Sequence, residues 1–217
     1  MSPTPPRRLK EMTPPDVERC LARRPTLLVP VGSTEQHGAH LPLGIDTIIV
    51  ERLADDLSGQ FDVLCAPAIE YAANRNPRRP MPGSAPLGRK TLHRLMNELV
   101  EAWELGSGVT DFVLITAEGH EAHQEALSTL LIKEARVQVV DIFSLDFGDL
   151  LERPGMPAHG GELDTSLLLH IAPQLARMDA ATDTPEATPS LASAEKGARL
   201  YGFILDRIAV RCLNQES

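Results

Sequence analysis

The sequence predicts an α/β protein, with a doubly wound, mostly parallel sheet in a single domain and helices on both faces. Short apolar runs of strand length alternate along the chain with longer segments of helical periodicity. The 217 residues fit one domain of the larger sort, and no internal repeat is visible. The alternation of strands and helices favours right-handed crossovers between parallel strands.

The expected elements follow in chain order. Residues 1–14 are Pro-rich and are expected to form an N-terminal arm, and residues 15–217 the domain. The apolar runs predict strands over residues 26–31, 61–67, 111–116 and 137–143. The helical patterns predict helices from the Thr13–Asp16 segment to about residue 23, and over 47–58, 90–105, 121–135, 167–172 and 192–213. Residues 173–190 are expected to be irregular.

Composition excludes several classes of protein. Apolar content of 42% and charged content of 24% are those of an ordinary globular protein. The net charge of −9 argues against a nucleic-acid partner. No run of 18 apolar residues predicts a membrane span, and the polar N-terminus does not resemble a secretory signal. Three widely spaced cysteines form no disulfide framework, so we expect a cytoplasmic location.

A polar cluster follows the first predicted strand. Glu35 and His37 are two residues apart, so in extended backbone they share a face and lie roughly 6.6 Å apart. Asp46 stands where the next helix begins, and its two carboxylate oxygens could bridge two metals. Imidazole with carboxylate suits zinc, manganese or iron. From spacing alone, a solvated turn remains the alternative.

Two more clusters of ligand-type residues stand beside predicted strands or helices. One is the EGHEAH segment at 118–123, and the other contains His159 and Glu162. In a parallel sheet, the loops that follow the strands gather at one edge, so all three clusters can converge. Two divalent metals there could activate water against an amide, and a nearby histidine could transfer a proton to the leaving nitrogen. No Gly-x-Ser-x-Gly segment supports a serine nucleophile.

The segment PVGSTEQHGAHLPLGID at 30–46 resembles the signature of the creatininase family, P-x-G-S-x-E-Q-H-G-P-H-L-P-L-x-T-D. The resemblance continues more weakly through Pro82-Gly83-Ser84, EGH at 118–120 and HGGELDTS at 159–166. It covers the chain from about residue 10 to the end.

This resemblance implies a doubly wound fold, two divalent metal ions (Zn, Mn or Fe) and hydrolysis of C–N bonds in cyclic or formyl amides. It also implies a homo-oligomer, often a hexamer, acting on a small-molecule substrate. Carried over by motif, the metal ligands would be Glu35, His37, Asp46 and His120, with Asp46 bridging. Glu162 would complete the second metal site or hold the water, and His159 would be the proton shuttle.

This chain departs from the family pattern around residue 120. Creatininase has a metal-binding Glu where this chain has Ala122, and Glu118 replaces an Asn. Glu121 and His123 are unusual there and could be substitute ligands or substrate contacts, although a surface helix start is the alternative for Glu121. Glu118 could bind a cationic substrate group or pair with an arginine. We also place Ser84 among the expected substrate contacts.

The sequence therefore predicts a metal-dependent amidohydrolase acting on a small cyclic amide, a formamide or a related biosynthetic intermediate. One alternative is a binding or scaffold homologue with a degenerate metal site. Another is a pathway enzyme that opens a ring, trims a peptide or forms an amide on the same site. Specificity is expected to reside in residues 144–158 and in residues 69–89, with the basic group Arg75, Arg78, Arg79 and Arg89.

Overall fold

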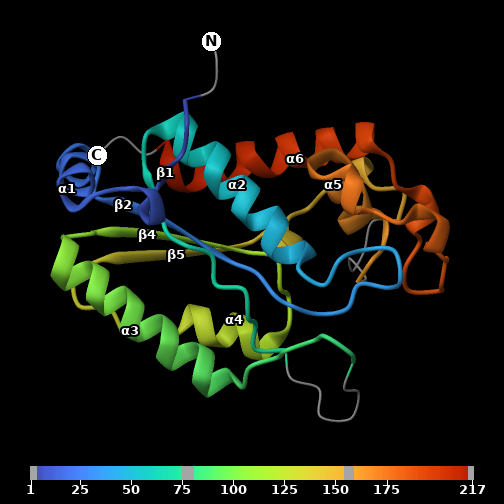
Figure 1. The fold of residues 1–217 in the computed structure, drawn as a ribbon, viewed down its shortest axis with the longest axis horizontal. Helices are drawn as coiled ribbons and strands as arrows, with labels where there is room; N and C mark the ends of the chain where they lie inside the picture. The colour runs from blue at the N-terminus through green and yellow to red at the C-terminus, as the bar shows by residue number, and fades with distance from the viewer. Residues whose placement is uncertain (1–3, 75–80, 154–158, 215–217) are drawn as a thin grey trace.

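A five-stranded sheet forms the centre of the protein (Figure 1). The computed structural model describes residues 4–74, 81–153 and 159–214. All neighbouring strands are parallel, in the order β1-β3-β2-β4-β5. The strands are β1 (Arg7–Arg8), β2 (Thr26–Val31), β3 (Leu64–Cys65), β4 (Asp111–Thr116) and β5 (Arg136–Asp141).

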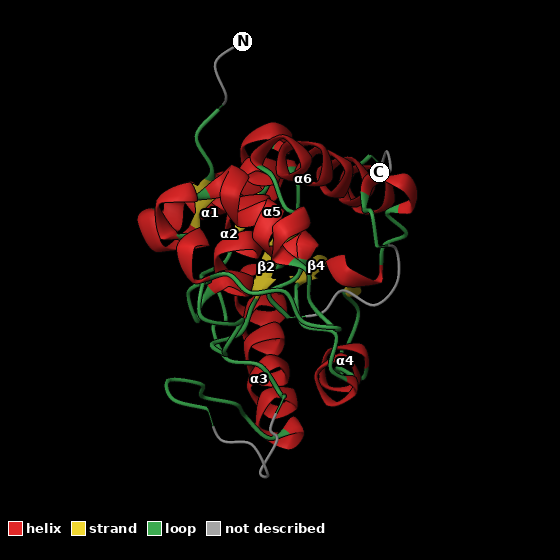
Figure 2. Cartoon of the chain, turned by 90° about the vertical axis from the view of Figure 1, so that its right-hand side faces the viewer, coloured by secondary structure: helices red, strands yellow, loops and turns green. Residues whose placement is uncertain are grey.

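Helices cover both faces of the sheet and bury two separate cores (Figures 1 and 2). One face carries α2 (Ile45–Phe61), α5 (Glu162–Ile171) and α6 (Ala194–Ile208), and the other carries α1 (Pro14–Arg23), α3 (Arg89–Ser107) and α4 (Glu121–Ser128). Within β2, Leu28 belongs to the first core and its neighbours Leu27 and Val29 to the second. Burial on both faces explains why β2 reads as a continuous apolar run, and the predicted doubly wound α/β class is confirmed.

The connections diverge between β2 and β4. From β2 the chain passes through α2 to β3 on one side, and from β4 it passes through α4 to β5 on the other. The two connecting helices lie on opposite faces of the sheet. At such a switch point the loops after the two strands separate and leave a crevice at their carboxyl ends. The polar segments that begin at Glu35 and Glu118 both enter this crevice.

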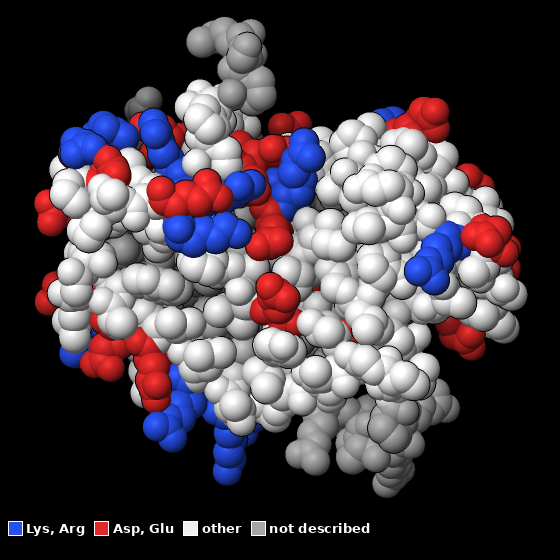
Figure 3. Space-filling view, viewed as in Figure 1, with Lys and Arg blue, Asp and Glu red and all other residues white. Residues whose placement is uncertain are grey.

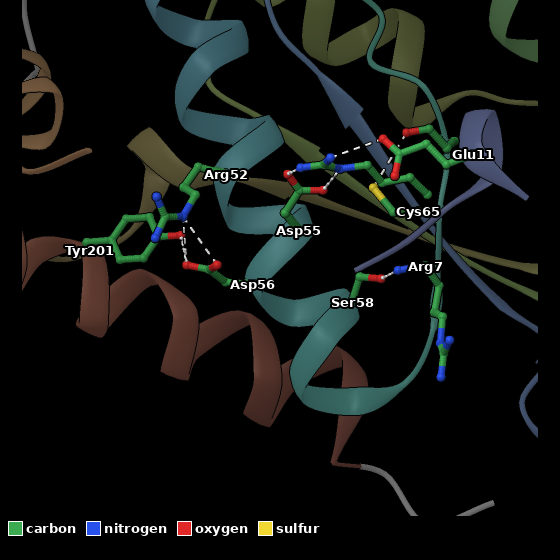
Figure 4. Close-up of polar contacts among 10 residues, drawn as sticks. Arg7, Glu11, Arg52, Asp55, Asp56, Ser58, Cys65 and Tyr201 are labelled. Carbon is green, nitrogen blue, oxygen red and sulfur yellow. Dashed lines mark hydrogen bonds and ion pairs between the residues drawn. The ribbon is translucent and has the colours of Figure 1, made fainter. Parts of the chain in front are cut away.

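The N-terminal segment differs from the expected loose arm. Arg7 and Arg8 pair with Leu64 and Cys65 as an edge strand. The Arg8 guanidinium lies 2.6 Å from Asp55 on α2, and the backbone N–H of Arg7 donates to Ser58 Oγ at 2.8 Å (Figure 4). In the face drawn in Figure 3, basic and acidic side chains alternate over this region without a patch of one sign. Ion pairing and strand pairing therefore hold residues 7–8 in the fold.

Several element boundaries also differ from prediction. β3 is short because Pro67 has no backbone N–H, and the ladder resumes only at an isolated bridge between Val31 and Ile69. Helix α4 ends at Ser128, and the backbone N–H groups of residues 133–135 donate to the Glu104 carboxylate at 2.7–3.3 Å where the helix was predicted to continue. α5 starts at 162 and not at 167. None of the described helices is long and apolar enough to cross a membrane.

Candidate metal centre

The loop that leaves β2 carries Glu35 and His37 into the crevice. Nδ1 of His37 lies 3.3 Å from the carbonyl oxygen of Glu35, so the imidazole presents Nε2 to the interior. Gly160 packs against this loop with φ of +72°, and a Cβ there would come within 2.5 Å of the His37 carbonyl oxygen. The HGG segment at 159–161 thus packs so closely against this loop that no residue larger than glycine fits at position 160.

Asp46 lies in the first turn of α2 and is 1% exposed. Its Oδ2 accepts a hydrogen bond from Ser33 Oγ at 2.6 Å, whereas Oδ1 accepts none from any described residue and lies 3.3 Å from Nε2 of His37. A Cβ on Gly32 would come within 2.4 Å of Thr47, so this glycine lets α2 start directly against the end of β2. An unsatisfied buried carboxylate oxygen is costly unless a cation faces it.

Glu118 enters the crevice from the end of β4 and is 3% exposed. Its Oε1 accepts the backbone N–H of His120 at 2.8 Å, and its Oε2 accepts from Asn74 Nδ2 at 2.7 Å. The same Asn74 amide also donates to Oε2 of Glu35. One neutral amide therefore links two carboxylates that would otherwise repel each other.

His159 closes the cluster from the solvent side. Its ring stacks on His37 with centroids 4.7 Å apart, and its Nδ1 lies 3.2 Å from Oε1 of Glu35. Its side chain is 51% exposed. Two sets of donor atoms, each within 4.8 Å of one another, result from this packing: Glu35 with His37 and His159, and Glu35 with Asp46 and Glu118. Glu35 belongs to both sets, which suits neighbouring metal positions.

These side chains line a cavity of about 500 Å³. Five carboxylates reach it, from Glu35, Asp46, Glu118, Asp141 and Asp164, together with His37, His120 and His159. Burial raises the pKa of Glu35, and the carboxylates of Glu118 and Asp46 raise it further. Burial alone would lower the pKa of His37, but Asp46 and other carboxylates outweigh it and raise this pKa to about 10. The cavity therefore favours bound positive charge, and its orphaned oxygens fit divalent metal ions.

The structure brings together five of the six predicted metal-binding and catalytic residues: Glu35, His37, Asp46, His120 and His159 all line the cavity. His120 is the N-cap of α4, and its Nδ1 accepts the backbone N–H of Ala122 at 3.3 Å. That contact leaves Nε2 to face the cavity or solvent. His120 lines the cavity but is exposed and lies outside the two tight sets of donor atoms.

Glu162 is a correction. Its carboxylate forms an ion pair with Lys196 and accepts the backbone N–H groups of Glu152 at 2.9 Å and Arg153 at 3.2 Å. It does not line the cavity. The next inward-facing carboxylate on α5 is Asp164, whose Oδ2 accepts from Gly160 N at 2.8 Å and whose Oδ1 has no hydrogen-bond partner among the described residues. Asp164, and not Glu162, reaches the site from this helix.

Three predicted substrate contacts also lie elsewhere. Glu121 is exposed at the start of α4. His123 is fully buried in contact with Thr116 Oγ1 at 2.9 Å and the backbone N–H of Ala73 at 3.3 Å, away from the cavity. Ser84 Oγ accepts the backbone N–H of Gln36 at 3.1 Å, so it supports the loop that carries Glu35 and His37. Of the four expected contacts, only Glu118 lies in the cavity, and the described residues include no arginine paired with it.

Three cavity residues with an amide or carboxylate side chain were not predicted from the sequence: Asn74, Asp141 and Asp164. Asp141 ends β5, and the rule that ligands gather at the carboxyl ends of parallel strands could have identified it. Asn74 and Asp164 belong to segments that were singled out, but nothing in their local pattern marked them. Arg75, Arg78 and Arg79 of the predicted basic loop lie outside the described residues, as do residues 154–158 of the second specificity loop.

Comparisons with known proteins agree with this fold and motif set. The mycofactocin precursor peptide peptidase of Mycolicibacterium smegmatis is 36% identical over 156 residues, which are 69% of this chain and 59% of that protein. The creatinine amidohydrolase of Pseudomonas putida is 25% identical over 186 residues, covering 75% of this chain and 70% of that protein. The match to the peptidase thus spans about three fifths of its length.

A solved structure of creatinine amidohydrolase (creatininase) superimposes with a TM-score of 0.82 at 20% identity, covering 97% of this chain and 99% of that one. This likeness concerns the fold. The family model described as creatinine amidohydrolase matches residues 10–200, which is most of the chain and includes every segment that lines the cavity. This protein therefore belongs to the creatininase family.

Proposed function

We propose that this protein is a metal-dependent hydrolase that cleaves an amide C–N bond with two divalent ions in the cavity. The main support is that the side chains of Glu35, His37 and Asp46 meet in the interior of the protein. Oδ1 of Asp46 faces no hydrogen-bond donor among the described residues other than the His37 ring. Bound divalent ions would supply Lewis-acid activation of water and of the amide carbonyl. Structural neighbours that include a manganese form and a Zn–Zn form of creatininase support this choice of cofactor.

Each residue would have a definite task. Glu35, His37, Asp46 and His120 would hold the ions. Ser33 fixes the Asp46 carboxylate through Oδ2, which keeps Oδ1 directed at the cavity. His159 is half exposed, stands at the mouth and contacts Glu35, so it can take a proton inside and donate it to the leaving nitrogen. Asp164 is buried in the cavity wall and interacts electrostatically with His159, so it would stabilise the protonated form of that imidazole.

The substrate class we favour is a small cyclic amide or a formamide, because the cavity is of small-molecule size and combines apolar surface with several ionisable side chains. Peptide trimming is the second candidate. Relatives named mycofactocin precursor peptide peptidase, 36% identical in one case, favour it, and the exposed edge formed by His159 would let a chain terminus enter. We also propose a cytoplasmic homo-oligomer, a hexamer by family resemblance, which light scattering can test.

Metal analysis and a substrate panel test this proposal. The purified protein should contain about two divalent ions per chain, and chelation should abolish hydrolysis that Mn²⁺, Zn²⁺ or Fe²⁺ restores. The His37→Ala variant should lose metal and activity, whereas His170→Ala, which removes an imidazole far from the cavity, should keep both. Full activity in metal-free protein would refute the proposal. A protein that binds no metal and hydrolyses neither amides nor peptides would indicate the scaffold alternative.

A further inference from the structure

Three carboxylates meet at one point of the cavity, two from the β2–α2 segment and one from the loop after β4. Glu35 follows β2, Asp46 begins α2 and Glu118 follows β4, and one oxygen of each lies within 4.8 Å of the others. Three negative charges in a buried space this small repel one another strongly. The Asn74 amide donates to two of them, but it carries no charge that could balance theirs.

The Glu118 carboxylate is directed into this group and not toward the mouth of the cavity. It is 3% exposed, and the backbone N–H of His120 and the Asn74 side chain fix its orientation. No described lysine or arginine forms an ion pair with it. Each of its oxygens accepts one hydrogen bond, so each retains a second acceptor position.

A second observation points to a ligand at the same place. Oδ1 of Asp46 belongs to a side chain that is 1% exposed and accepts no hydrogen bond from any described residue. Glu35 also has an unpartnered buried oxygen, Oε1, whose near neighbour is the imidazole of His159. Native interiors rarely leave such oxygens unsatisfied without an ion or a water.

We propose that Glu118 is a metal ligand, which binds one divalent cation together with Glu35 and Asp46. The inference rests on the proposed metal-dependent activity and adds a ligand at a position where the family signature has an Asn. It gives the two metal positions different chemistry: one is rich in carboxylate, and the other combines Glu35 with the imidazole of His37. Carboxylate oxygen suits Mn²⁺ and Mg²⁺, whereas imidazole suits Zn²⁺. Glu118 therefore biases its position toward Mn²⁺.

The test measures metal binding and needs no substrate. Metal-depleted wild type, Glu118→Gln and Glu121→Gln are titrated by calorimetry with MnCl₂ and, separately, with ZnCl₂, and bound metal is counted after gel filtration. Glu121 is a matched control because it is a glutamate three residues away that points to solvent. We expect Glu118→Gln to weaken one of two Mn²⁺ sites by about tenfold or more, to weaken Zn²⁺ binding less, and Glu121→Gln to match wild type.

The outcomes separate the two proposals. Wild type that binds no divalent metal would refute the proposed function itself. Wild type that binds metal while Glu118→Gln binds Mn²⁺ equally well would overturn the inference, including the case in which the variant loses only substrate affinity. If Glu118→Gln does not fold, anomalous scattering from Mn²⁺ in wild-type crystals decides. A metal beyond bonding distance of the Glu118 carboxylate would then refute its role as a ligand.

Discussion

The loop after β2 and the start of α4 both carry closely spaced polar residues, but they place them differently. After β2 the chain forms no helix before Ile45, and Glu35 and His37, two residues apart, enter one cavity. After β4 the chain passes almost at once into α4, where the period is 3.6 residues. Glu118 and His120 precede the helix and reach the cavity, whereas Glu121 points to solvent and His123 into the core beneath.

The start of α5 behaves in the same way. Glu162 and Asp164 are two residues apart, yet only Asp164 faces the cavity, while Glu162 turns to Lys196 on α6. A spacing of two on a helix separates side chains by about 200° around the axis, so both carboxylates cannot serve one site. Two polar residues at a spacing of two therefore predict a shared site only where the backbone between them is not helical.

The largest expected effect concerns Asp46, at the inner end of the loop after β2. Asp46→Asn keeps the shape and can keep the Ser33 contact, but it removes the negative charge that we expect to bind metal. Mutating a residue that merely orients a metal ligand typically lowers metal affinity or activity by about 10- to 100-fold. Because Asp46 is a proposed ligand itself, we expect hydrolytic activity to fall more than about 100-fold. Elemental analysis should show loss of metal in parallel. If the variant retained both ions, Asp46 would not be a metal ligand.

Lys196→Met should have the next largest effect, on stability. The substitution leaves Glu162, whose side chain is 5% exposed, without its cation, and breaking one partner of a buried pair typically costs about 3–5 kcal/mol. The free energy of unfolding, measured in denaturant, should fall by an amount of that order, while metal content per folded chain stays at the wild-type level. Loss of metal from the folded variant would instead indicate that Glu162 contributes to the metal site.

Much of the fold follows from the sequence because its signals are local. The apolar runs at 26–31 and 111–116 coincide with β2 and β4, and the segment at 35–37 could be interpreted by counting residues. The direction in which a side chain on a helix points, however, depends on contacts with distant residues. Glu162 is turned away from the cavity by its ion pair with a lysine 34 residues further along the chain. His123 is held in the core by contacts with Thr116 and the backbone of Ala73. Asn74 reaches the cavity only because its loop crosses to Glu35 and Glu118.

His123 gives a third test, because a buried core histidine and a ligand at the cavity titrate differently. Burial lowers the pKa of His123 to about 4. A folded pKa below the unfolded value of about 6.5 costs no stability above pH 6.5, and stability is lost as the pH falls from there toward 4, by about 3 kcal/mol in all. NMR should show the ring of His123 neutral down to about pH 5. Titration near pH 6.5 would indicate a solvent-accessible ring.

The smallest effect is expected for Glu121→Gln. The side chain is exposed in the first turn of α4, where a negative charge interacts favourably with the helix N-terminus by about 0.3–1 kcal/mol. We expect the free energy of unfolding to fall by no more than that, most clearly at low ionic strength, and kcat and KM to match wild type. Glu118 precedes the helix and Glu121 lies within it. A loss of metal binding in Glu118→Gln but not in Glu121→Gln would therefore show that the start of α4 separates these two side chains. A raised KM in Glu121→Gln would instead mean that α4 begins later in solution and that its first residue turns into the cavity.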